Sequence, residues 1–324
     1  MSKPLSAFRY DAEGRDSEIT LDKGTLAGLG RSALLWIDIP DADEAQIDQV
    51  AKTLELDPRL LTALRRKEPR YLVENYGDYH HFTVCVPPPG CERGDPIRLD
   101  FVVGASWLVS VHKGPVGFLG EFRKQDKGET KTGTLSGTAF AGTLLDWQLE
   151  VYFREVAEIE ETIDDLDDRI LDEGANDALL EEILGVRRRV SSLRRLLAAQ
   201  RPVFYGLERP DVIAASPDAA EPHAARLVSR YERALDEIER TRELLLGSFE
   251  LLSSRTAQTT NELVKALTFF TVIIGSAAAV AGLFGMNFDP PFFKSGSVGF
   301  FAVVLGLLLL SGAAFAWAKH KRWL

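Results

Sequence analysis

The fold is decided by two uncharged apolar stretches near the end of the chain: ALTFFTVIIGSAAAVAGLFGM (Ala266–Met286) and VGFFAVVLGLLLLSGAAFAWA (Val298–Ala318). Each is 21 residues long, and a helix needs about 20 apolar residues to cross the core of a bilayer. The buried hairpin of a soluble protein would not require two such stretches in succession. The sequence therefore predicts two transmembrane helices, residues 266–286 and 298–318, joined by an extracytoplasmic loop over residues 287–297.

Basic residues flank the two predicted spans on one side of the membrane. Lys265 precedes the first span and the tail KHKRWL (residues 319–324) follows the second, whereas the loop holds one Asp and one Lys. Positive charge next to a span stays in the cytoplasm, and Trp317 and Trp323 suit the inner interface. We therefore expect a multi-pass protein of the plasma (inner) membrane, with both termini in the cytoplasm.

The residues before the spans divide by pattern into three parts. Residues 1–136 alternate β-rich runs with helical ones and predict a cytoplasmic α/β domain with adjacent antiparallel strands. Residues 137–222 pair an acidic helix with a basic one and predict an antiparallel helical arm. Residues 223–265 predict a long stalk helix, because no proline interrupts the pattern between Ala224 and Pro290. The fold class is thus an α/β cytoplasmic domain followed by long helices and two C-terminal transmembrane helices.

Several short patterns in the first part predict local structure. Asp43 and Asp57 can each cap a helix. His80 and His81 adjoin one strand, and alternation along it would bury one and expose the other, so we expect a surface pair rather than a metal site. Farther along, the acidic run Asp164–Asp168 is expected to be a solvated helix face. Five runs rich in Val, Phe, Tyr and Trp are typical of strands: Ala33–Pro40, Arg70–Tyr76, Tyr79–Pro87, Ile97–Val103 and Trp107–Lys113.

The charge distribution and motifs exclude some classes of function. The formal net charge is −10, and residues 265–324 carry five Lys or Arg and one acid, a net of +4, so residues 1–264 carry −14. Nucleic acid is not an expected partner, because phosphate binding needs a basic face. The sequence has no Gly-rich phosphate loop and no GxSxG elbow, so we expect neither an enzyme nor a cofactor. Cys85 and Cys91 are too few for a disulfide framework.

The first predicted span has a surface of small residues, among them Gly275, Ala278 and Gly282. Small residues let helices approach closely in a membrane, so we expect a homo-oligomer with a central path; a plain dimer is the alternative. Asn287 stands at the outer end of this span. A ring of Asn carbonyl oxygens can hydrogen-bond the waters of Mg²⁺, which dehydrates reluctantly, although a lone Asn there can also be a helix C-cap.

The stretch TNELVKALTFFTVIIGSAAAVAGLFGMNF (Thr260–Phe288), together with the terminal KHKRWL, closely resembles the CorA family of divalent-cation transporters. That family has a Gly-Met-Asn signature at the outer end of its first span and a basic C-terminus that ends in Trp-Leu. Looser similarity covers Arg70–Val86, Phe101–Lys113 and Asp164–Asp168, so the resemblance extends over essentially the whole chain.

The resemblance implies a funnel-shaped homopentamer whose long helix lines a pore for Mg²⁺, with Co²⁺ or Ni²⁺ tolerated, driven by the membrane potential. Asn287 would be the outer site for the hydrated ion, with Gly285 and Met286 completing the selectivity ring, and Asn261 would form an inner polar ring. Three further groups would line the same path: Val264 and Leu267 at a constriction that gates by dewetting, Thr271, Gly275 and Ala278 along the wall, and Lys319, Lys321 and Arg322 in a basic collar at the inner mouth.

Three features depart from the usual pattern of that family. The loop after the signature reads FDPPFFK (residues 288–294), in which only Asp289 could draw cations to the entrance. The usual proline in mid-span is absent. Arg226 stands where magnesium-gated members place an acid between subunits, so gating by an ion bound at that position is not expected.

Two alternatives stay open. The ZntB branch of relatives moves Zn²⁺, has been linked to proton coupling, and typically has Gly-Ile-Asn or Gly-Val-Asn at the signature; the atypical loop and Arg226 motivate this alternative. A membrane-anchored cytoplasmic sensor without ion flux is the remote alternative, motivated by the large soluble part of the chain.

Overall fold

In the computed structural model of the chain, the described residues are 6–13, 16–21, 33–88, 95–125, 131–174, 176–213, 220–284 and 296–320. The chain divides into two compact units. The first unit comprises residues 1–165 and 181–247, and the second comprises residues 166–180 and 248–324. Helix α9 (Ala220–Phe284) contributes residues to both units.

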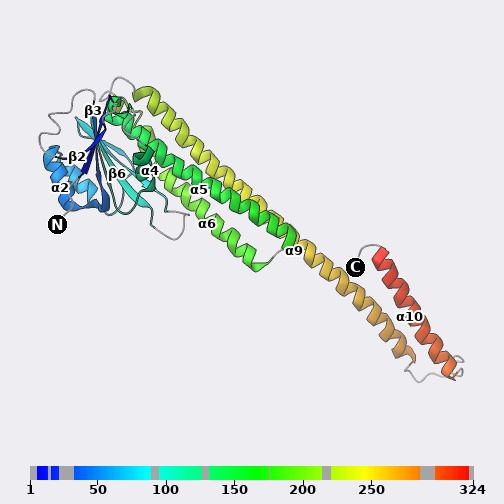
Figure 1. The fold of residues 1–324 in the computed structure, drawn as a ribbon. Coiled ribbons are helices and arrows are strands. Elements are labelled where there is room, and N and C mark those ends of the chain that lie inside the picture. The colour runs from blue at the N-terminus through cyan, green and yellow to red at the C-terminus, as the bar shows by residue number, and fades with distance from the viewer. Residues whose placement is uncertain are drawn as a thin grey trace. The chain divides into compact units, whose positions relative to one another are not determined.

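The first unit is built on a mixed sheet (Figure 1). Its described strands follow the order β2-β1-β3-β7-β6-β5-β4. The strands are β1 (Ser6–Asp11), β2 (Ser17–Thr20), β3 (Ala33–Ile39), β4 (Val73–Asn75), β5 (Tyr79–Val86), β6 (Ile97–Gly104) and β7 (Trp107–His112). Among these strands only β3 and β7 pair in parallel; the other pairs are antiparallel. β3 and β7 are parallel neighbours although two α-helices and strands β4 to β6 lie between them in the sequence.

Two helices and one face of the sheet form a single apolar core. α2 (Glu44–Thr53) begins at Asp43, whose carboxylate accepts hydrogen bonds from two backbone N–H groups of the first turn. α3 (Pro58–Leu64) begins at Asp57, which accepts from one such group. These caps satisfy donors that a helix start otherwise leaves unpaired. The core combines alternate strand residues with residues of the two helices: Leu35, Ile37, Ile39, Val102, Val109 and Val111 with Ile47, Val50 and Leu60.

The opposite face of β3 meets α4 (Gly117–Gln125) and α5 (Gly137–Glu173). Trp36 stands between Leu35 and Ile37 in the sequence, and both of these belong to the core described above. Since successive strand residues point to opposite faces, the buried ring of Trp36 projects to the other side of the sheet. There its ring centroid lies 5.9 Å from that of Phe122 and 5.8 Å from that of Phe140. The sheet is therefore covered on both faces.

Buried polar side chains join β5 to the long helices of the first unit. Gln148 and Tyr152 of α5 donate hydrogen bonds to the carbonyl oxygen of Cys85, at 2.7 and 3.1 Å. The N–H of Cys85 donates to Oε1 of Gln200, which follows α6 (Asp177–Ala199), at 2.9 Å. Each bond satisfies a buried group that would otherwise cost about 1–3 kcal/mol. The remaining short helices of the described residues are η1 (Pro40–Ala42), η3 (Thr132–Thr134), α7 (Arg201–Gly206) and α8 (Pro210–Ile213).

Within the first unit, α9 buries a stripe of residues spaced by three and four positions, as an amphipathic helix does: Leu227, Tyr231, Ala234, Ile238, Thr241 and Leu245. Outside this stripe, arginines of α9 pair with carboxylates of α5. Arg226 Nη2 lies 3.6 Å from Asp146 Oδ2, and Arg230 pairs with Asp146 and Glu150. Exposed ion pairs contribute about 0–1 kcal/mol each, so the buried stripe supplies most of the stability of this packing.

The second unit contains the C-terminal half of α9 and α10 (Gly296–His320). Each of these two helices contains a strongly apolar stretch of 18 residues, and neither stretch is buried inside the structure. By length and composition, both helices can cross a membrane. The predicted fold class, an α/β domain followed by long helices and two apolar C-terminal helices, is confirmed.

Candidate functional site

Six of the residues predicted to line an ion path belong to the described part of α9. They follow one another at steps of three or four, so a helix with 3.6 residues per turn places them on one face. All six are exposed in the single chain; Val264 and Leu267, for example, are 54 % and 68 % exposed. This face, the candidate face, consists of Asn261, Val264, Leu267, Thr271, Gly275 and Ala278.

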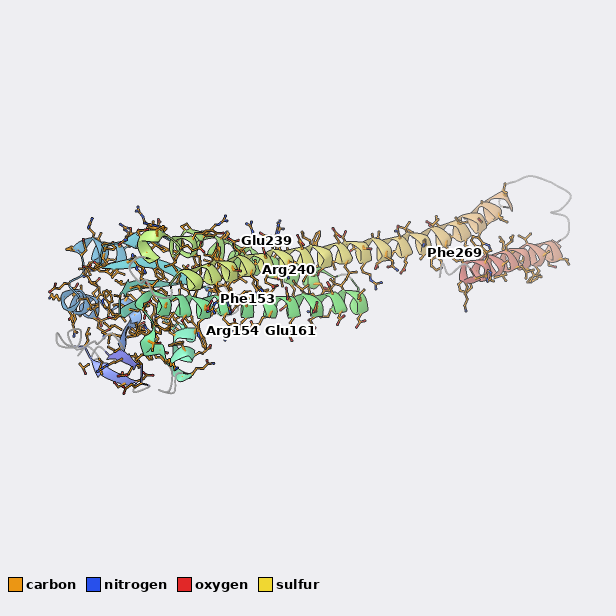
Figure 2. The ribbon with its side chains drawn as sticks, turned by 90° about the horizontal axis from the view of Figure 1, so that it is seen from above. Phe153, Arg154, Glu161, Glu239, Arg240 and Phe269 are labelled. Carbon is orange, nitrogen blue, oxygen red and sulfur yellow. The ribbon has the colours of Figure 1, made fainter. Side chains whose placement is uncertain are left out.

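The opposite side of α9 packs against α10. The rings of Phe269, labelled in Figure 2, and Phe315 of α10 lie 6.4 Å apart between centroids. Half-buried residues recur on this side of α9 at helical spacing: Ala266, Phe269, Ile273, Ala277 and Val280. At 100° per residue, this stripe is displaced by about half a turn from the candidate face. The contact with α10 therefore leaves the candidate face open.

Which side of the first span meets the second was not predicted from the sequence. Side-chain size alone gives no clear signal for it. The side toward α10 includes Ala266 and Ala277 as well as Phe269, and the candidate face includes the bulky Val264 and Leu267.

Hydroxyl groups near the candidate face donate to the backbone of their own helix. Thr271 Oγ1 donates to Leu267 O, and Thr268 Oγ1 donates to Val264 O, both at 2.8 Å. Because each hydroxyl proton is used in this way, the lone pairs of the oxygen stay available to water. Gly275 has no atom within 4 Å of the position that a Cβ would take. The candidate face thus combines neutral oxygen acceptors with a surface that admits close approach.

Two groups of predicted site residues lie outside the described part of the chain: Gly285, Met286, Asn287 and Asp289 at the outer end, and Lys321 and Arg322 of the basic collar. Lys319, the third residue of the collar, is described and lies exposed in the last turn of α10. A cation at that end interacts favourably with the helix dipole.

The described residues include no cluster of three or more His, Cys, Asp or Glu that could hold a metal ion. Asp164, Asp165 and Asp168 are exposed on α5, in keeping with a solvated helix face. Arg226 is 67 % exposed and pairs with Asp146 of its own chain. These acids and this arginine therefore form ordinary surface features in the single chain.

The prediction of a surface histidine pair is wrong. His80 and His81 are 3 % and 4 % exposed, because β5 lies between two other strands and is covered on both faces. Burial lowers the pKa of His80 to about 4. His81 Nε2 lies 3.0 Å from Asp100 Oδ1, and its Nδ1 lies 3.4 Å from Glu74 Oε2. Burial alone would lower the pKa of His81, but hydrogen bonds to these two carboxylates outweigh it and raise the pKa.

A family profile described as "CorA-like Mg2+ transporter protein" matches residues 31–321, most of the chain. The chain belongs to this family. The CorA-like family comprises divalent metal-ion transporters, so the resemblance predicted from the sequence is confirmed.

Relatives of both CorA and ZntB type are similar to this CorA-like chain. The cobalt/magnesium transport protein CorA of Thermotoga maritima is 24 % identical over 182 residues, which cover 56 % of this chain and 51 % of the relative. The zinc transport protein ZntB of Yersinia enterocolitica is 25 % identical over 186 residues, covering 55 % and 56 %. The chain spans about half the length of the first curated relatives that it matches.

The fold is shared with a solved structure over the full length of both chains. The CorA magnesium transporter from Methanocaldococcus jannaschii is 20 % identical, covers 100 % of this chain and 100 % of its own, and superimposes with a TM-score of 0.76. At this level of identity, the similarity establishes the fold and leaves the ion and the assembly to be argued from this chain.

Proposed function

We propose that this CorA-like chain is one subunit of a homopentamer that carries divalent cations across the membrane, chiefly Mg²⁺, with Co²⁺ or Ni²⁺ tolerated. The main support is the candidate face of α9, which is exposed and lies opposite the contact with α10. Membership of the CorA-like family supplies the class of cargo. Amide and hydroxyl oxygens suit a hydrated cation because they bind its water without holding the ion too tightly.

Five copies of α9 around an axis would bury the candidate face and leave α10 toward lipid. The open space at Gly275 supports this arrangement, since small residues permit close packing of helices in a membrane. On α10, Phe300, Leu309 and Leu310 are 67 %, 66 % and 71 % exposed, as lipid-facing residues would be. The choice of five copies rests on the resemblance to the CorA family.

The ion would pass from the outer end of α9 to the cytoplasm. The entrance would comprise the selectivity ring and one acid: Gly285, Met286, Asn287 and Asp289. Beyond Thr271, the side chains of Val264 and Leu267 would form an apolar constriction that closes by dewetting, and Asn261 would offer a polar ring on its inner side. A basic collar would surround the inner mouth: Lys319, Lys321 and Arg322.

The membrane potential would drive the flux. With both termini in the cytoplasm of a cell with an inside-negative plasma (inner) membrane, each 100 mV favours entry of a divalent cation by about 4.6 kcal/mol, twice the value for a single charge. Neither a catalytic step nor a cofactor is needed for transport of this kind.

Replacement of Asn287 by Ala should abolish Mg²⁺ influx into proteoliposomes, because the ring would lose the oxygen atoms that hold the hydrated ion. The measurement is the initial rate from a Mg²⁺-sensitive dye under an inside-negative potential. Leu309→Ala, at an exposed position of α10, is the matched control and should keep the wild-type rate. Unchanged influx in Asn287→Ala would contradict the proposal that Asn287 binds the hydrated ion.

A second candidate cargo is Zn²⁺, carried with protons. Similarity to ZntB zinc transport proteins supports it, as do the atypical loop at residues 288–294 and the basic Arg226. A competition flux assay with Mg²⁺, Zn²⁺, Co²⁺ and Ni²⁺, with and without a pH gradient, separates the two. Zn²⁺ flux that requires the gradient would favour this candidate, and Mg²⁺ flux that follows the potential alone would favour the first.

A membrane-anchored sensor without flux is the remote alternative, since most of the chain precedes the two apolar helices. Native mass spectrometry of the purified chain would favour it by giving a dimer in place of a pentamer, together with no influx of any tested ion.

A further inference from the structure

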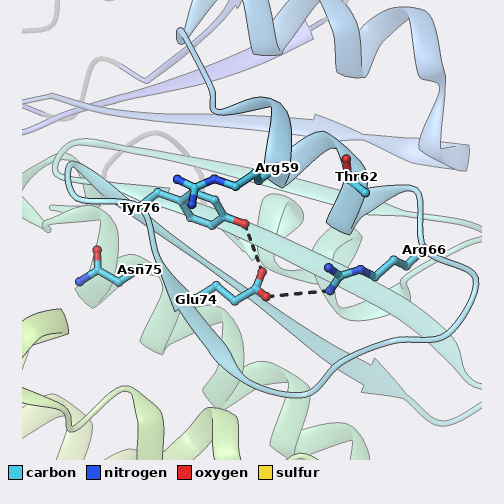
Figure 3. A pocket seen from close by; sticks show the side chains of 6 residues that line it. All are labelled: Arg59, Thr62, Arg66, Glu74, Asn75 and Tyr76. Carbon is cyan, nitrogen blue, oxygen red and sulfur yellow. Dashed lines mark hydrogen bonds and ion pairs between the residues drawn. The ribbon is translucent and has the colours of Figure 1, made fainter.

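A polar pocket of about 470 Å³ opens in the first unit between α3 and the end of β4 (Figure 3). Its lining combines two guanidinium groups with one carboxylate: Arg59, Thr62, Arg66, Glu74, Asn75 and Tyr76. No sequence pattern predicted this site, because its residues come from two separate elements. The two arginines give this pocket a positive charge, whereas residues 1–264 as a whole carry a net negative charge.

The carboxylate of Glu74 is compensated from the interior of the domain. Its Oε2 lies 3.4 Å from His81 Nδ1, and the Tyr76 hydroxyl donates to the same oxygen at 3.2 Å. Hydrogen bonds to Glu74 and Asp100 raise the pKa of His81 above its usual value, so the two carboxylates favour the protonated imidazole. The other carboxylate at His81 belongs to Asp100, and Arg98 Nε pairs with it at 2.6 Å. The imidazole therefore lies between two carboxylates, of which Asp100 also pairs with Arg98.

The two arginines of the pocket keep donors unused. The Arg66 guanidinium lies 3.9 Å from Glu74, beyond hydrogen-bond range, and its side chain has no other partner among the described residues. Arg59 lies over the ring of Tyr76, 5.9 Å from the centroid. Asp57 accepts hydrogen bonds from Nε and Nη2 of Arg59, which leaves Nη1 available within the described structure. Both side chains can therefore offer N–H donors to a ligand.

We propose that this pocket binds a small phosphorylated metabolite, whose phosphate oxygens accept hydrogen bonds from Arg66 and Arg59. A guanidinium group binds phosphate through two parallel N–H donors, and the guanidinium group of Arg66 has such donors available. The volume lies within the range of about 300–1,000 Å³ that is common for small-molecule sites, so the pocket holds more than a phosphate. The organic part of the ligand lies along Thr62, because the ring of Tyr76 is stacked on Tyr79 and covered by Arg59.

This site is independent of the ion path. All six lining residues belong to the first unit, whereas the candidate face belongs to the second. Phosphate binding and cation influx are separate measurements, so failure of this proposal can be distinguished from failure of the proposed transport function.

Calorimetric titration of the purified full chain in detergent with inorganic phosphate tests the site, against sodium chloride at equal ionic strength. Arg66→Gln should weaken phosphate binding about tenfold or more, because it removes charge-assisted hydrogen bonds. Arg65→Gln is the matched control, since Arg65 pairs with Asp48 outside the pocket, and should bind as the wild type does. Arg66→Lys keeps the charge but not the two parallel donors, and should bind with intermediate affinity.

The pH dependence of binding gives a second readout, with sulfate as a dianion that does not titrate near neutral pH. The charged groups that face His81 are Glu74 on β4 and Asp100 and Arg98 on β6, with Arg66 across Glu74. Loss of the His81 proton removes one positive charge beside Glu74 and leaves the pocket more negative, so sulfate binding should weaken as the pH rises through the raised pKa of His81. His81→Gln should abolish this dependence.

Equal phosphate affinity in the wild type and Arg66→Gln would overturn the proposal, as would heats no larger than those of sodium chloride. Acetate that binds as tightly as phosphate, with the same dependence on Arg66, would overturn the phosphate class in favour of a carboxylate. If Arg66→Gln lowers the melting temperature of the chain, Arg59→Gln serves as the second variant, with the same expected loss.

Discussion

His80 and His81 are neighbours on β5, yet their surroundings shift their pKa values in opposite directions. Nε2 of His80 is buried without a hydrogen-bond partner among the described residues, and burial lowers its pKa to about 4. Because the unfolded chain binds this proton more readily, stability from His80 is lost as the pH falls from about 6.5 toward 4. His81 has the opposite sign: its contribution is complete below about pH 6.5 and is lost as the pH rises through its raised pKa.

His81→Gln should lower the free energy of unfolding by about 1–3 kcal/mol near pH 6, because two charge-assisted hydrogen bonds disappear. The difference from the wild type should be smaller at alkaline pH, above the raised pKa of His81, where the imidazole has lost its proton. Urea unfolding of the full chain in detergent, followed by tryptophan fluorescence, measures it. The exposed His320 provides the control through His320→Gln, and a difference that is the same at both pH values would contradict the charged state of His81.

At the scale of elements, the start of α5 is held against the turn between β6 and β7. The N–H of Gly137 donates to Ala105 O at 2.8 Å. A Cβ on Gly137 would collide with the carbonyl oxygen of Gly104 and lie 2.8 Å from that of Trp107. Both obstacles are backbone atoms, which cannot move aside without displacing the strands. The close approach of helix and sheet therefore requires glycine at this position.

Gly137→Ala should destabilise the first unit by about 1–3 kcal/mol, the usual cost of overpacking. Gly142→Ala, in the same helix but with nothing within 4 Å of the added atom, should be neutral or stabilise by up to about 1 kcal/mol, because Ala favours the helix. Urea unfolding curves of the two variants provide the comparison. Equal stability of both variants would show that the helix start can shift to make room.

At the scale of the whole molecule, assembly through the candidate face can be blocked at one position. Gly275→Leu should prevent formation of the proposed pentamer, because a bulky side chain on the candidate face would separate the copies of α9. Gly312→Leu on α10 is the control, since it too has open space in the single chain but lies on the helix expected to face lipid. Native mass spectrometry reports the number of copies; pentamers in both variants would exclude this packing.

Much of the fold could be predicted because it depends on neighbours in the sequence. The two spans follow from uncharged length, since a helix satisfies all of its own backbone groups in lipid. The helix starts at Asp43 and Asp57 follow from capping within one turn. β1 and β2 were not predicted, and neither was the parallel pairing of β3 with β7, because these depend on partners distant in the chain. The domain boundaries and the roles assigned along the ion path stay predictions.

By itself, the sequence determined two apolar helices long enough to cross a membrane, most of the helical and strand segments after residue 33 and the resemblance to a family of divalent-cation transporters, because hydropathy, periodicity and capping act over a few residues. Only the tertiary structure decided which faces are covered. It buried both histidines of β5, turned Phe269 toward α10 and away from the candidate face, and brought Arg66 beside Glu74. The physical reason is that burial and charge compensation depend on what packs against a residue, and those partners come from distant parts of the chain.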